Sequence, residues 1–508
     1  MDRVKRVVIF GGGTAGWMTA TALAKTLGRH VAIDLLESDA IGIVGVGEAT
    51  IPTIHWFNEL IGLDEAKFVA ATKASFKLGI EFVDWTRPGH RYFHPFGQYG
   101  VDLGPVPFHH RWLKAQAEGA TQPLSAYSLA TALAADNRFS KPTAESRSIL
   151  STLGYAYHFD AALYAAHLRG IAEASGVTRH EGKLATVEQD PQTGFVTSIT
   201  TERGDMLAGD LFIDCSGFRA LLIGDTMGAA FEDWSHWLPC DRAVAVPCAR
   251  VTETTPYTRS TARSAGWQWR IPLQHRTGNG YVYSSSFLSD DEAAATLLGN
   301  LDGEPLADPR FLRFKAGFRR NAWTKNVVAI GLSSGFLEPL ESTSIHLIQS
   351  GIAKLITLFP DRDCDPGLAH QFNRTFGRDM DGIKDFLILH YHATQGRDDP
   401  LWAYVRHMPL PDTLKEREEQ YRRSGRLMLG GDELFRDASW LAVLNGQEIC
   451  ATGFSPLAET LDADINRRQL DQIADVIVRA VPTLPKHDDA IAKLIGAQVA
   501  RPAAVAVA

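Results

Sequence analysis

The chain lacks the features that mark several large classes of protein. Its five cysteines are scattered and never form a C-x-x-C pair, so the sequence predicts neither a disulfide framework nor a zinc site. No uninterrupted apolar run is long enough to span a bilayer, and the first apolar strand begins almost at once, which argues against a signal peptide. We therefore expect a cytoplasmic protein that holds no metal and does not enter a membrane.

Long runs of one charge and internal repeats are also missing. The chain has 51 Lys and Arg against 59 Asp and Glu, a net charge of -8, and no basic tract. This balance argues against broad binding of nucleic acid. Apolar residues make up 45% of the sequence, which is ordinary for a globular enzyme. A length of 508 residues exceeds one ordinary domain, so we expect two lobes.

The most informative stretch that is present lies near the N-terminus. A β-branched apolar run over residues 7–10 predicts a buried strand, and Gly11-x-Gly13-x-x-Gly16 follows it directly, before an Ala-rich helical pattern. In a dinucleotide site Gly11 makes the tight turn, Gly13 lets the pyrophosphate approach the backbone, and Gly16 lets helix and strand pack closely. The start of the helix offers unpaired N–H groups to the phosphates.

The second requirement of a dinucleotide site is met by the following strand. Residues 31–36 are again apolar and β-branched, and they end in Glu37, at the right distance to hydrogen-bond a ribose hydroxyl. The sequence therefore predicts a dinucleotide site. The alternative is a glycine turn that binds no ligand.

A lysine among apolar residues ends the next segment. Residues 53–80 predict helix, broken near Gly62, and finish in FKLG with Lys77. A surface lysine that lays its stem along apolar neighbours is the ordinary alternative for such a residue. Residues 84–111 are then rich in aromatic rings and histidine. They predict either an aromatic pocket or simple core packing.

Three later stretches carry further patterns. Residues 211–214 form an apolar strand that closes on Asp214, and residues 240–290 predict antiparallel strands with Trp267 and Trp269 on one face. Residues 326–350 predict a strand, a glycine loop and a helix from about Ser342, whose N-terminus could bind an anion.

The same loop matches the hydrolase pattern G-x-S-x-G at residues 331–335. No helix follows the serine directly, and no Asp-then-His pair stands out downstream, so we reject a serine hydrolase. Residues 351–508 predict a mostly helical lobe, and residues 501–508 a loose tail.

Taken together, these stretches resemble the flavin-dependent halogenases of the tryptophan-halogenase-like family. The resemblance rests on GWQWRIP at residues 266–272, which is similar to the family's G-W-x-W-x-I-P signature and separates it from related monooxygenases. It is joined in order by GVGEATIP at 45–52, FKLG at 76–79, DCSGF at 214–218 and GFLEPLEST at 335–343. These motifs cover about the first 350 residues.

The resemblance implies an α/β (α+β) fold with a Rossmann-like FAD lobe of the flavin monooxygenase type. Residues 1–350 would form this lobe with an inserted antiparallel sheet on the substrate side, residues 351–500 a helical lobe that caps the substrate, and residues 501–508 the tail. The residues implied in FAD binding are Gly11, Gly13, Thr14, Ala15, Gly16, Glu37, Gly47, Ala49, Asp214, Gly331 and Leu337.

The resemblance also implies the chemistry. Reduced flavin and O₂ oxidise a halide ion, bound on the backbone N–H groups of Thr343 and Ser344, to hypohalous acid. Many relatives have glycine where this chain has Ser344. The oxidant passes through a tunnel lined by Trp267 and Trp269, which would keep organic substrates from the flavin. Lys77 matches the family's essential lysine and holds the electrophilic halogen, and Glu341 matches its essential acid.

The substrate pocket matches the family only in its aromatic half. His94 and Phe96 match the pocket's H-x-F, and Phe435 lies where a stacking ring is expected. Residues 425–434 lack the tyrosine pair of tryptophan-specific enzymes, so we expect indole or an indole derivative rather than free tryptophan, with bromide or chloride as halide.

Two other functions remain open from the sequence. One is an FAD-dependent aromatic monooxygenase, and the other is a flavoprotein without turnover. No nicotinamide site is evident beyond the FAD loop, so a separate NAD(P)H-dependent flavin reductase is expected to supply FADH₂ by transient contact or diffusion. The enzyme itself is expected to be a monomer or homodimer.

Overall fold

The computed structural model describes residues 2–41, 47–119 and 122–496, and it divides into two compact units. Each unit is assembled from three separate stretches of the chain. The first unit comprises Met1–Ala74, Phe159–Asp241 and Arg313–Asp381, and the second comprises Ser75–His158, Arg242–Leu312 and Gly382–Ala508. The division into functional lobes at residue 350 stays a prediction, and the tail at 501–508 lies outside the described residues.

The first unit is built on a six-stranded sheet whose interior strands run parallel. Its strands, in spatial order, are β20 (Trp323–Thr324), β21 (Val327–Ala329), β12 (Leu211–Asp214), β1 (Arg6–Phe10), β2 (Ala32–Glu37) and β8 (Thr178–Glu181). Only the edge strand β20 runs antiparallel to its neighbour. Strand β1 is almost fully buried, as its apolar run predicts for a parallel strand covered on both faces.

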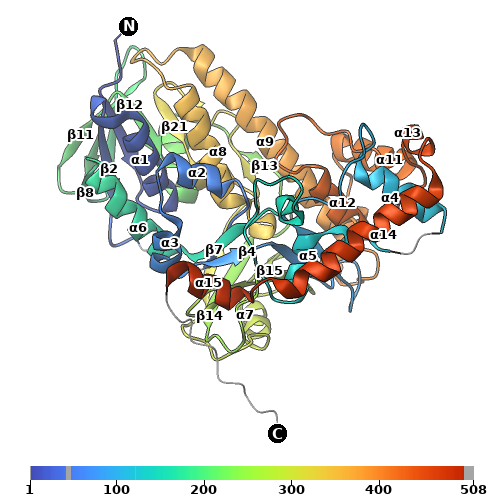
Figure 1. Cartoon of the computed structure of the whole chain (residues 1–508). Helices are drawn as coiled ribbons and strands as arrows, with labels where there is room; N and C mark the ends of the chain where they lie inside the picture. The colour runs from blue at the N-terminus through green and yellow to red at the C-terminus, as the bar shows by residue number, and fades with distance from the viewer. Residues whose placement is uncertain (1, 42–46, 120–121, 497–508) are drawn as a thin grey trace. The chain divides into compact units, whose positions relative to one another are not determined.

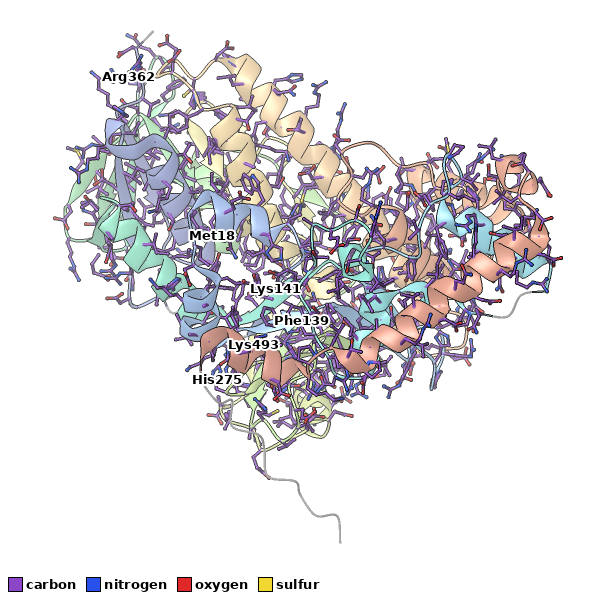
Figure 2. All side chains as sticks on the ribbon, viewed as in Figure 1. Met18, Phe139, Lys141, His275, Arg362 and Lys493 are labelled. Carbon is purple, nitrogen blue, oxygen red and sulfur yellow. The ribbon has the colours of Figure 1, made fainter. Side chains whose placement is uncertain are left out.

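Helices cover this sheet. Helix α1 (Thr14–Leu27) packs against α6 (Ala161–Ala174) and α8 (Thr343–Thr357), and Figure 1 shows α1 and α6 beside the strands. Met18 of α1, labelled in Figure 2, is fully buried. Helix α9 (Pro366–His392) begins in this unit. Two small sheets complete it, made of β9 (Leu184–Gln189), β10 (Val196–Thr201), β11 (Met206–Ala208), β13 (Glu232–Asp233), β19 (Gly317–Phe318) and β22 (Gly335–Phe336).

The second unit is built on a seven-stranded, largely antiparallel sheet. Its strands, in spatial order, are β18 (Arg310–Arg313), β14 (Arg242–Cys248), β17 (Thr277–Tyr283), β16 (Gly266–Pro272), β15 (Thr258–Arg263), β5 (Gly79–Val83) and β6 (Arg91–Pro95). The predicted antiparallel strands over 240–290 are therefore present. Every residue of the tryptophan-bearing strand β16 is buried, because β15 and β17 flank it in the middle of the sheet.

Short helices make up most of the remainder of the second unit. They are α4 (Phe108–Ala117), α5 (Leu129–Ala135), α7 (Asp290–Leu298), α10 (Pro400–His407), α11 (Asp412–Ser424), α12 (Asp437–Gly446), α13 (Pro456–Glu459), α14 (Ala463–Ala480) and α15 (His487–Ile495). Helices α9 to α15 give residues 366–496 the predicted helical character, whereas α4, α5 and α7 lie earlier in the sequence. Within the described ranges, no helix combines the length and apolar character needed to cross a membrane.

The predicted helix over residues 53–80 is wrong in its last third. The chain forms α2 (Ile54–Leu60) and α3 (Glu65–Ala71), and then two strands, β4 (Ser75–Lys77) and β5. Lys73 adopts a left-handed backbone with φ of 53°, which stops helical propagation. Strand β4 then pairs antiparallel with β7 (Ala156–Asp160), a partner some eighty residues later. Lys77 therefore lies on a buried strand rather than on a helix.

Candidate active site

The predicted cofactor residues of the first unit lie along one edge of its parallel sheet. Strand β1 ends at Phe10, which is paired with Leu36 on one side and with Asp214 on the other, and Asp214 is paired with Ala329. The glycine loop, Glu37, Asp214 and the glycine loop at 331 thus follow the carboxyl ends of four neighbouring strands. Ligands of open α/β sheets bind in this position.

The three glycines differ in what a side chain would meet. A Cβ on Gly16 would lie 1.8 Å from the Gly11 carbonyl oxygen, and one on Gly11 would lie 2.2 Å from the Cys215 carbonyl oxygen. A Cβ on Gly13, the N-cap of α1, would meet no atom within 4 Å. Gly11 and Gly16 are thus required by the fold, whereas Gly13 faces open space at the first free N–H groups of a 14-residue helix. This geometry fits a pyrophosphate group.

The carboxylate of Glu37 is held by residues that sequence reasoning missed. Trp17 Nε1 donates to Glu37 Oε2 over 3.3 Å, and Arg179 Nε donates to Glu37 Oε1 over 2.5 Å. Arg179 also pairs with Asp39 and Glu181, so one guanidinium serves three carboxylates. Glu37 lies against Gly12, where a Cβ would be only 1.6 Å from Oε2. The network fixes this carboxylate beside the glycine loop.

The loop that follows β12 uses Asp214 as an internal anchor. Its fully buried carboxylate accepts from the Ser216 hydroxyl at 2.6 Å and from the backbone N–H groups of Leu222 and Ile223 at 2.9 and 2.8 Å. Burial raises the pKa of Asp214, and these hydrogen bonds oppose the shift. The carboxylate is used in hydrogen bonds to protein groups, so Asp214 acts on this edge of the site by holding the backbone in place.

The glycine loop at 331–335 approaches the first glycine loop. Gly331, with φ of 82°, is so close to α1 that a Cβ would lie 2.8 Å from the Ala15 Cβ. The Ser333 hydroxyl is buried and donates to the Asp214 carbonyl oxygen over 2.5 Å. It is therefore not placed as a nucleophile, in agreement with the rejection of a hydrolase. Leu337 is buried just beyond this loop.

A titratable carboxyl that the sequence did not single out lies in the GVGEATIP motif. Strand β3 (Gly47–Ala49) carries Glu48 between the predicted residues Gly47 and Ala49, both buried. Burial raises the pKa of Glu48 from 4.5 to about 7. Residues 42–46, including Gly45 of the same motif, lie outside the described residues.

The raised pKa of Glu48 predicts a specific dependence of stability on pH. The folded chain holds a proton that the unfolded chain releases between pH 4.5 and 7, so the free energy of unfolding should fall across that interval and then level off. The loss amounts to about 3 kcal/mol at most. Glu48→Gln should remove it, as measured by urea unfolding of cofactor-free protein at pH 5 and pH 8. The exposed Glu59→Gln is the control. If the free energy of unfolding fell equally between pH 5 and pH 8 in wild type and in Glu48→Gln, the raised pKa of Glu48 would be wrong.

The predicted halide site lies at the start of α8. Glu341 ends a short 3₁₀ turn and is fully buried, and Ser342 then adopts a left-handed backbone with φ of 59° as the N-cap of α8. Thr343 and Ser344 are the first two residues of this 15-residue helix, so their backbone N–H groups have no acceptor within it. The positive end of the helix dipole adds to the attraction for an anion.

In the second unit Lys77 lies beside a wall of aromatic rings. Lys77 is fully buried, and its Nζ lies 5.0 Å from the ring centroid of Phe96. His94 is 6.3 Å from Phe96 and 6.4 Å from Phe435 between ring centroids. The structure therefore brings together all four predicted residues of this unit's substrate side.

One further ring of this wall escaped sequence reasoning. Phe386 of α9 stacks on Phe435 with centroids 4.0 Å apart, and it also contacts His94 at 5.8 Å and Trp440 at 5.1 Å. In the sequence it is one apolar residue in a long amphipathic helix, which is the pattern of ordinary core packing. We call His94, Phe96, Phe386 and Phe435 the aromatic wall.

The two tryptophans of the signature motif lie on the same face of β16. Their ring centroids are 6.2 Å apart, and both side chains are buried. The indole N–H groups of Trp267 and Trp269 have no hydrogen-bond partner in the described part of the chain. Buried donors of this kind are suited to hydrogen-bond a small polar molecule.

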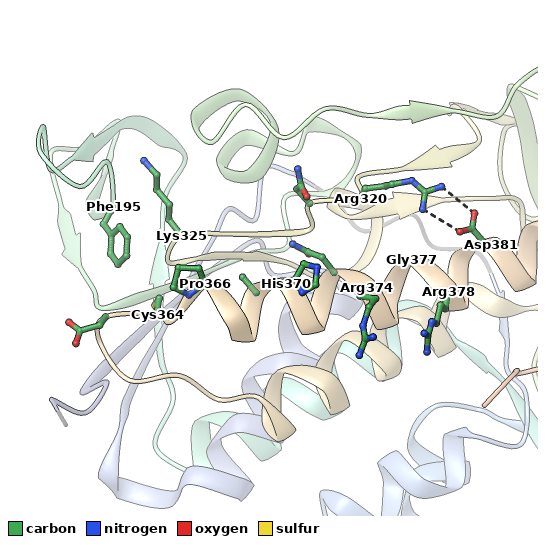
Figure 3. A pocket seen from close by; sticks show the side chains of 14 residues that line it. Phe195, Arg320, Lys325, Cys364, Pro366, His370, Arg374, Gly377, Arg378 and Asp381 are labelled. Atoms are coloured by element: carbon green, nitrogen blue, oxygen red, sulfur yellow. Dashed lines mark hydrogen bonds and ion pairs between the residues drawn. The ribbon is translucent and has the colours of Figure 1, made fainter. Parts of the chain in front are cut away.

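A surface pocket of about 760 Å³ lies elsewhere in the first unit. It is lined by the start of α9, the turn between β20 and β21, and Phe195, with Arg320 paired to Asp381 at its rim (Figure 3). None of the predicted cofactor, halide or catalytic residues lines it. This pocket shares no lining residue with the predicted sheet-edge site or with the aromatic wall.

Comparison with known proteins identifies the family. The family model described as tryptophan halogenase matches residues 6–463. The chain is 36% identical to the tryptophan 6-halogenase SttH of Streptomyces toxytricini over 95% of this chain and 97% of that protein.

Two solved structures are also similar over nearly the whole chain. BrvH, a flavin-dependent halogenase from Brevundimonas sp. BAL3, is 46% identical with a TM-score of 0.93, and the match covers 97% of this chain and 99% of that one. Xcc4156, a flavin-dependent halogenase from Xanthomonas campestris, is 45% identical with a TM-score of 0.94, over 99% and 100% of the two chains. With a Rossmann-like cofactor edge, a buried lysine and full-length matches of this kind, the chain belongs to the tryptophan halogenase family of flavin-dependent halogenases, oxidoreductases that use FADH₂ and halide.

Proposed function

We propose that this enzyme halogenates indole or an indole-bearing compound other than free tryptophan, and that Lys77 presents the halogen to the ring. The observation that carries the proposal is the placement of Lys77, whose buried Nζ lies 5.0 Å from Phe96 at one end of the aromatic wall. A flat aromatic substrate stacked on this wall would lie beside the amine. Stacked and edge-on rings are the favoured arrangement for such contacts.

The polar groups near the wall favour a substrate without an amino-acid head. Arg417, which stacks over Trp440 at 4.4 Å, pairs with Glu433 at 2.8 Å. Arg436 donates to the carbonyl oxygens of Gly430 and Gly431. Both arginines are therefore engaged by the protein rather than offered to a substrate carboxylate. In contrast, the relative SttH is named a tryptophan 6-halogenase.

We assign the FAD to the carboxyl edge of the parallel sheet. The open space at Gly13, with the N-terminus of α1, would receive the pyrophosphate together with Thr14 and Ala15, and Glu37 would accept from a ribose hydroxyl. Gly331 and Leu337 are assigned to the flavin side of the same edge. Gly47 and Ala49, which lie on β3 of a separate small sheet, are assigned to the flavin as well. When bound, the reduced flavin supplies the two-electron reduction of O₂ that turns halide into hypohalous acid.

The pyrophosphate assignment predicts that Gly13→Ala separates cofactor binding from folding. The added methyl meets no protein atom, so the free energy of unfolding should change by less than about 1 kcal/mol. It would occupy the space assigned to the phosphates, so the affinity for FAD should fall at least tenfold, about 1.4 kcal/mol. Flavin fluorescence titration measures this. Gly170→Ala in α6, where a Cβ is equally unobstructed, is the control, and unchanged FAD affinity in Gly13→Ala would refute the assignment.

We assign the halide to the backbone N–H groups of Thr343 and Ser344 and a proton-transfer role to Glu341. The helix start attracts an anion without a charged side chain, which leaves the adjacent buried carboxyl of Glu341 able to exchange a proton with the oxidant or with the ring intermediate. Trp267 and Trp269 are assigned to the oxidant's path, where their unpaired indole N–H groups can hydrogen-bond it.

The proposal is tested by product analysis with competing substrates. Purified enzyme, FAD, a flavin reductase and NADH are incubated with indole or tryptophan, in bromide or chloride, and products are identified by mass spectrometry. Enzymes of this family act on aromatic compounds and need a separate reductase, so the reductase is supplied. A halogen isotope pattern on indole at a higher rate than on tryptophan supports the proposal. Preference for tryptophan would overturn it, and a gain of one oxygen without halide would indicate a hydroxylase.

A further inference from the structure

The strand that carries Lys77 is held by two buried histidines that come from distant parts of the second unit. His158, on β7, lies opposite Ser75 of β4, and its Nδ1 is 3.0 Å from the Ser75 Oγ. His487, the first residue of α15, accepts from the backbone N–H of Phe76 at Nε2 over 3.0 Å. Both histidines are fully buried. The two residues that precede Lys77 are thus each fixed by one imidazole.

The donor and the acceptor of each hydrogen bond around His158 can be assigned in only one way. The Ser75 hydroxyl donates its single proton to the Pro272 carbonyl oxygen over 2.6 Å, so it must accept from His158 Nδ1–H. His158 Nε2 then accepts from the Thr258 hydroxyl over 2.9 Å. Pro272 ends β16, the strand of the tryptophan motif. The chain of bonds therefore ties the Lys77 strand to the strand that carries Trp267 and Trp269.

His487 is fixed in one tautomer by the same reasoning. Its Nδ1 lies 2.7 Å from the Thr254 carbonyl oxygen, which can only accept, so Nδ1 carries the proton and Nε2 is free to accept from Phe76 N–H. The Phe76 ring also stacks on Phe139 with centroids 3.9 Å apart, and Phe139 itself lies 6.0 Å from the His487 ring; Phe139 is labelled in Figure 2. The strand is held by both backbone and side chain.

Both imidazoles must be neutral for this arrangement, and their surroundings keep them so. Burial and the nearby Lys77 lower the pKa of His158 well below its ordinary value, and His487 and Arg270 act in the same sense. Burial lowers the pKa of His487 to about 4; Asp488 and the Thr254 carbonyl oppose the shift, and Arg250 adds to it. Protonation of His487 Nε2 would turn this acceptor into a donor, and the hydrogen bond from the Phe76 N–H would be lost.

From this geometry we propose that His158 and His487 form a histidine clamp that positions Lys77, so that its amine delivers the halogen to the substrate before the hypohalous acid escapes. Neither histidine touches the substrate; both are positioning residues that act through Ser75 and Phe76. The inference rests on the proposed role of Lys77. A reacting group displaced by about 1 Å loses about two orders of magnitude in rate, so a loosened strand should lose product while oxidant is still made.

The test measures the fraction of hypohalous acid that ends as halogenated indole. Oxidant that escapes is captured by a 1,3-diketone trap, and FADH₂ oxidation is followed separately. His487→Leu, which removes the acceptor, should lower this coupled fraction at least tenfold with unchanged FADH₂ oxidation. His487→Gln, whose amide oxygen can accept from Phe76 N–H, should recover it to within about threefold. Ser75→Ala, which breaks the other half of the clamp with little change in volume, should also lower it.

A matched control separates positioning from loss of stability. His109 is also buried in the second unit and hydrogen-bonds a carbonyl oxygen, that of Gly425, at 3.0 Å, but it has no bond to β4. His109→Leu should lower the thermal midpoint as His487→Leu does and leave the coupled fraction unchanged. Hydrogen exchange of the Phe76 amide can be measured without cofactor. It should be faster than wild type in His487→Leu but not in His109→Leu.

The outcomes distinguish the inference from the proposed function. If Lys77→Met still makes halogenated indole, the proposed role of Lys77 is wrong. If Lys77→Met loses the product but both His487→Leu and Ser75→Ala remain fully coupled, only the clamp is refuted. A loss of coupling in His109→Leu as large as that in His487→Leu would also refute it, because coupling would then follow stability.

Discussion

Replacing Lys77 by methionine is expected to lower the yield of halogenated product at least about 10³-fold while FADH₂ oxidation continues. Methionine keeps the unbranched, apolar stem in its fully buried position on β4 and removes the amine that lies over Phe96. Hypohalous acid would then reach the substrate only by chance collision, and the gain from holding two reactants in place would be lost. The oxidant should appear instead in a diketone trap, in an amount that matches the FADH₂ consumed.

Another buried lysine provides the control for this change. Lys114 is also buried in the second unit and donates to the Leu461 carbonyl oxygen over 2.6 Å. Lys114→Met removes a buried amine of the same kind away from the aromatic wall, and it should keep the coupled fraction even if the protein is less stable. Equal product from Lys77→Met and wild type, at equal folded concentration, would rule out the halogen-presenting role.

Glu341→Gln is expected to lower the rate of halogenation by about 10²-fold or more, with FAD bound as in wild type. The glutamine keeps the volume of a fully buried side chain next to the start of α8 but cannot take up or release a proton. Positioned proton transfer contributes factors of this size. Single-turnover product formation, with FAD affinity measured in parallel, separates the chemical step from cofactor binding.

The neighbouring carboxyl of the same loop serves as the comparison. Glu338 is also buried and lies three residues before Glu341. Glu338→Gln therefore removes a buried carboxyl from this loop at a different point, and a purely structural requirement would affect both variants alike. A smaller loss in Glu338→Gln supports proton transfer by Glu341. Equal losses would show that the loop, rather than the acid, limits the rate.

The parts of the site that could be predicted are those whose residues lie close together in the sequence in recognisable patterns. Gly11, Gly13, Gly16 and Glu37 sit in one strand–turn–helix–strand segment, whose glycine spacing follows directly from the turn and the close packing that it needs. The aromatic residues His94 and Phe96 are likewise close in the sequence, with one residue between them. Such patterns predict local geometry, and in the structure Gly11 and Gly16 pack as closely as the turn requires, while the cofactor role of the segment stays a prediction.

The residues that escaped prediction depend on partners far along the chain. Arg179 lies 142 residues from Glu37, and nothing in its own neighbourhood indicates that it binds that carboxylate. Phe386 is an ordinary apolar residue of a helix until β6 and α12 bring His94 and Trp440 against it. The helix predicted up to residue 80 failed because β4 acquires its partner only at residues 156–158.

The hydrogen bond between Phe76 and His487 joins residues that are 411 positions apart in the sequence, so they are synthesised at very different times. At ribosomal rates of about 5–20 residues per second, the strand that carries Lys77 leaves the ribosome roughly 20–80 s before the histidine that holds it. A nascent chain can therefore complete the strands around its glycine loop before the strand of Lys77, the residue that we propose presents the halogen, is held by His487. If the clamp is needed, the capacity to direct a halogen onto a substrate is acquired later in synthesis than the cofactor edge.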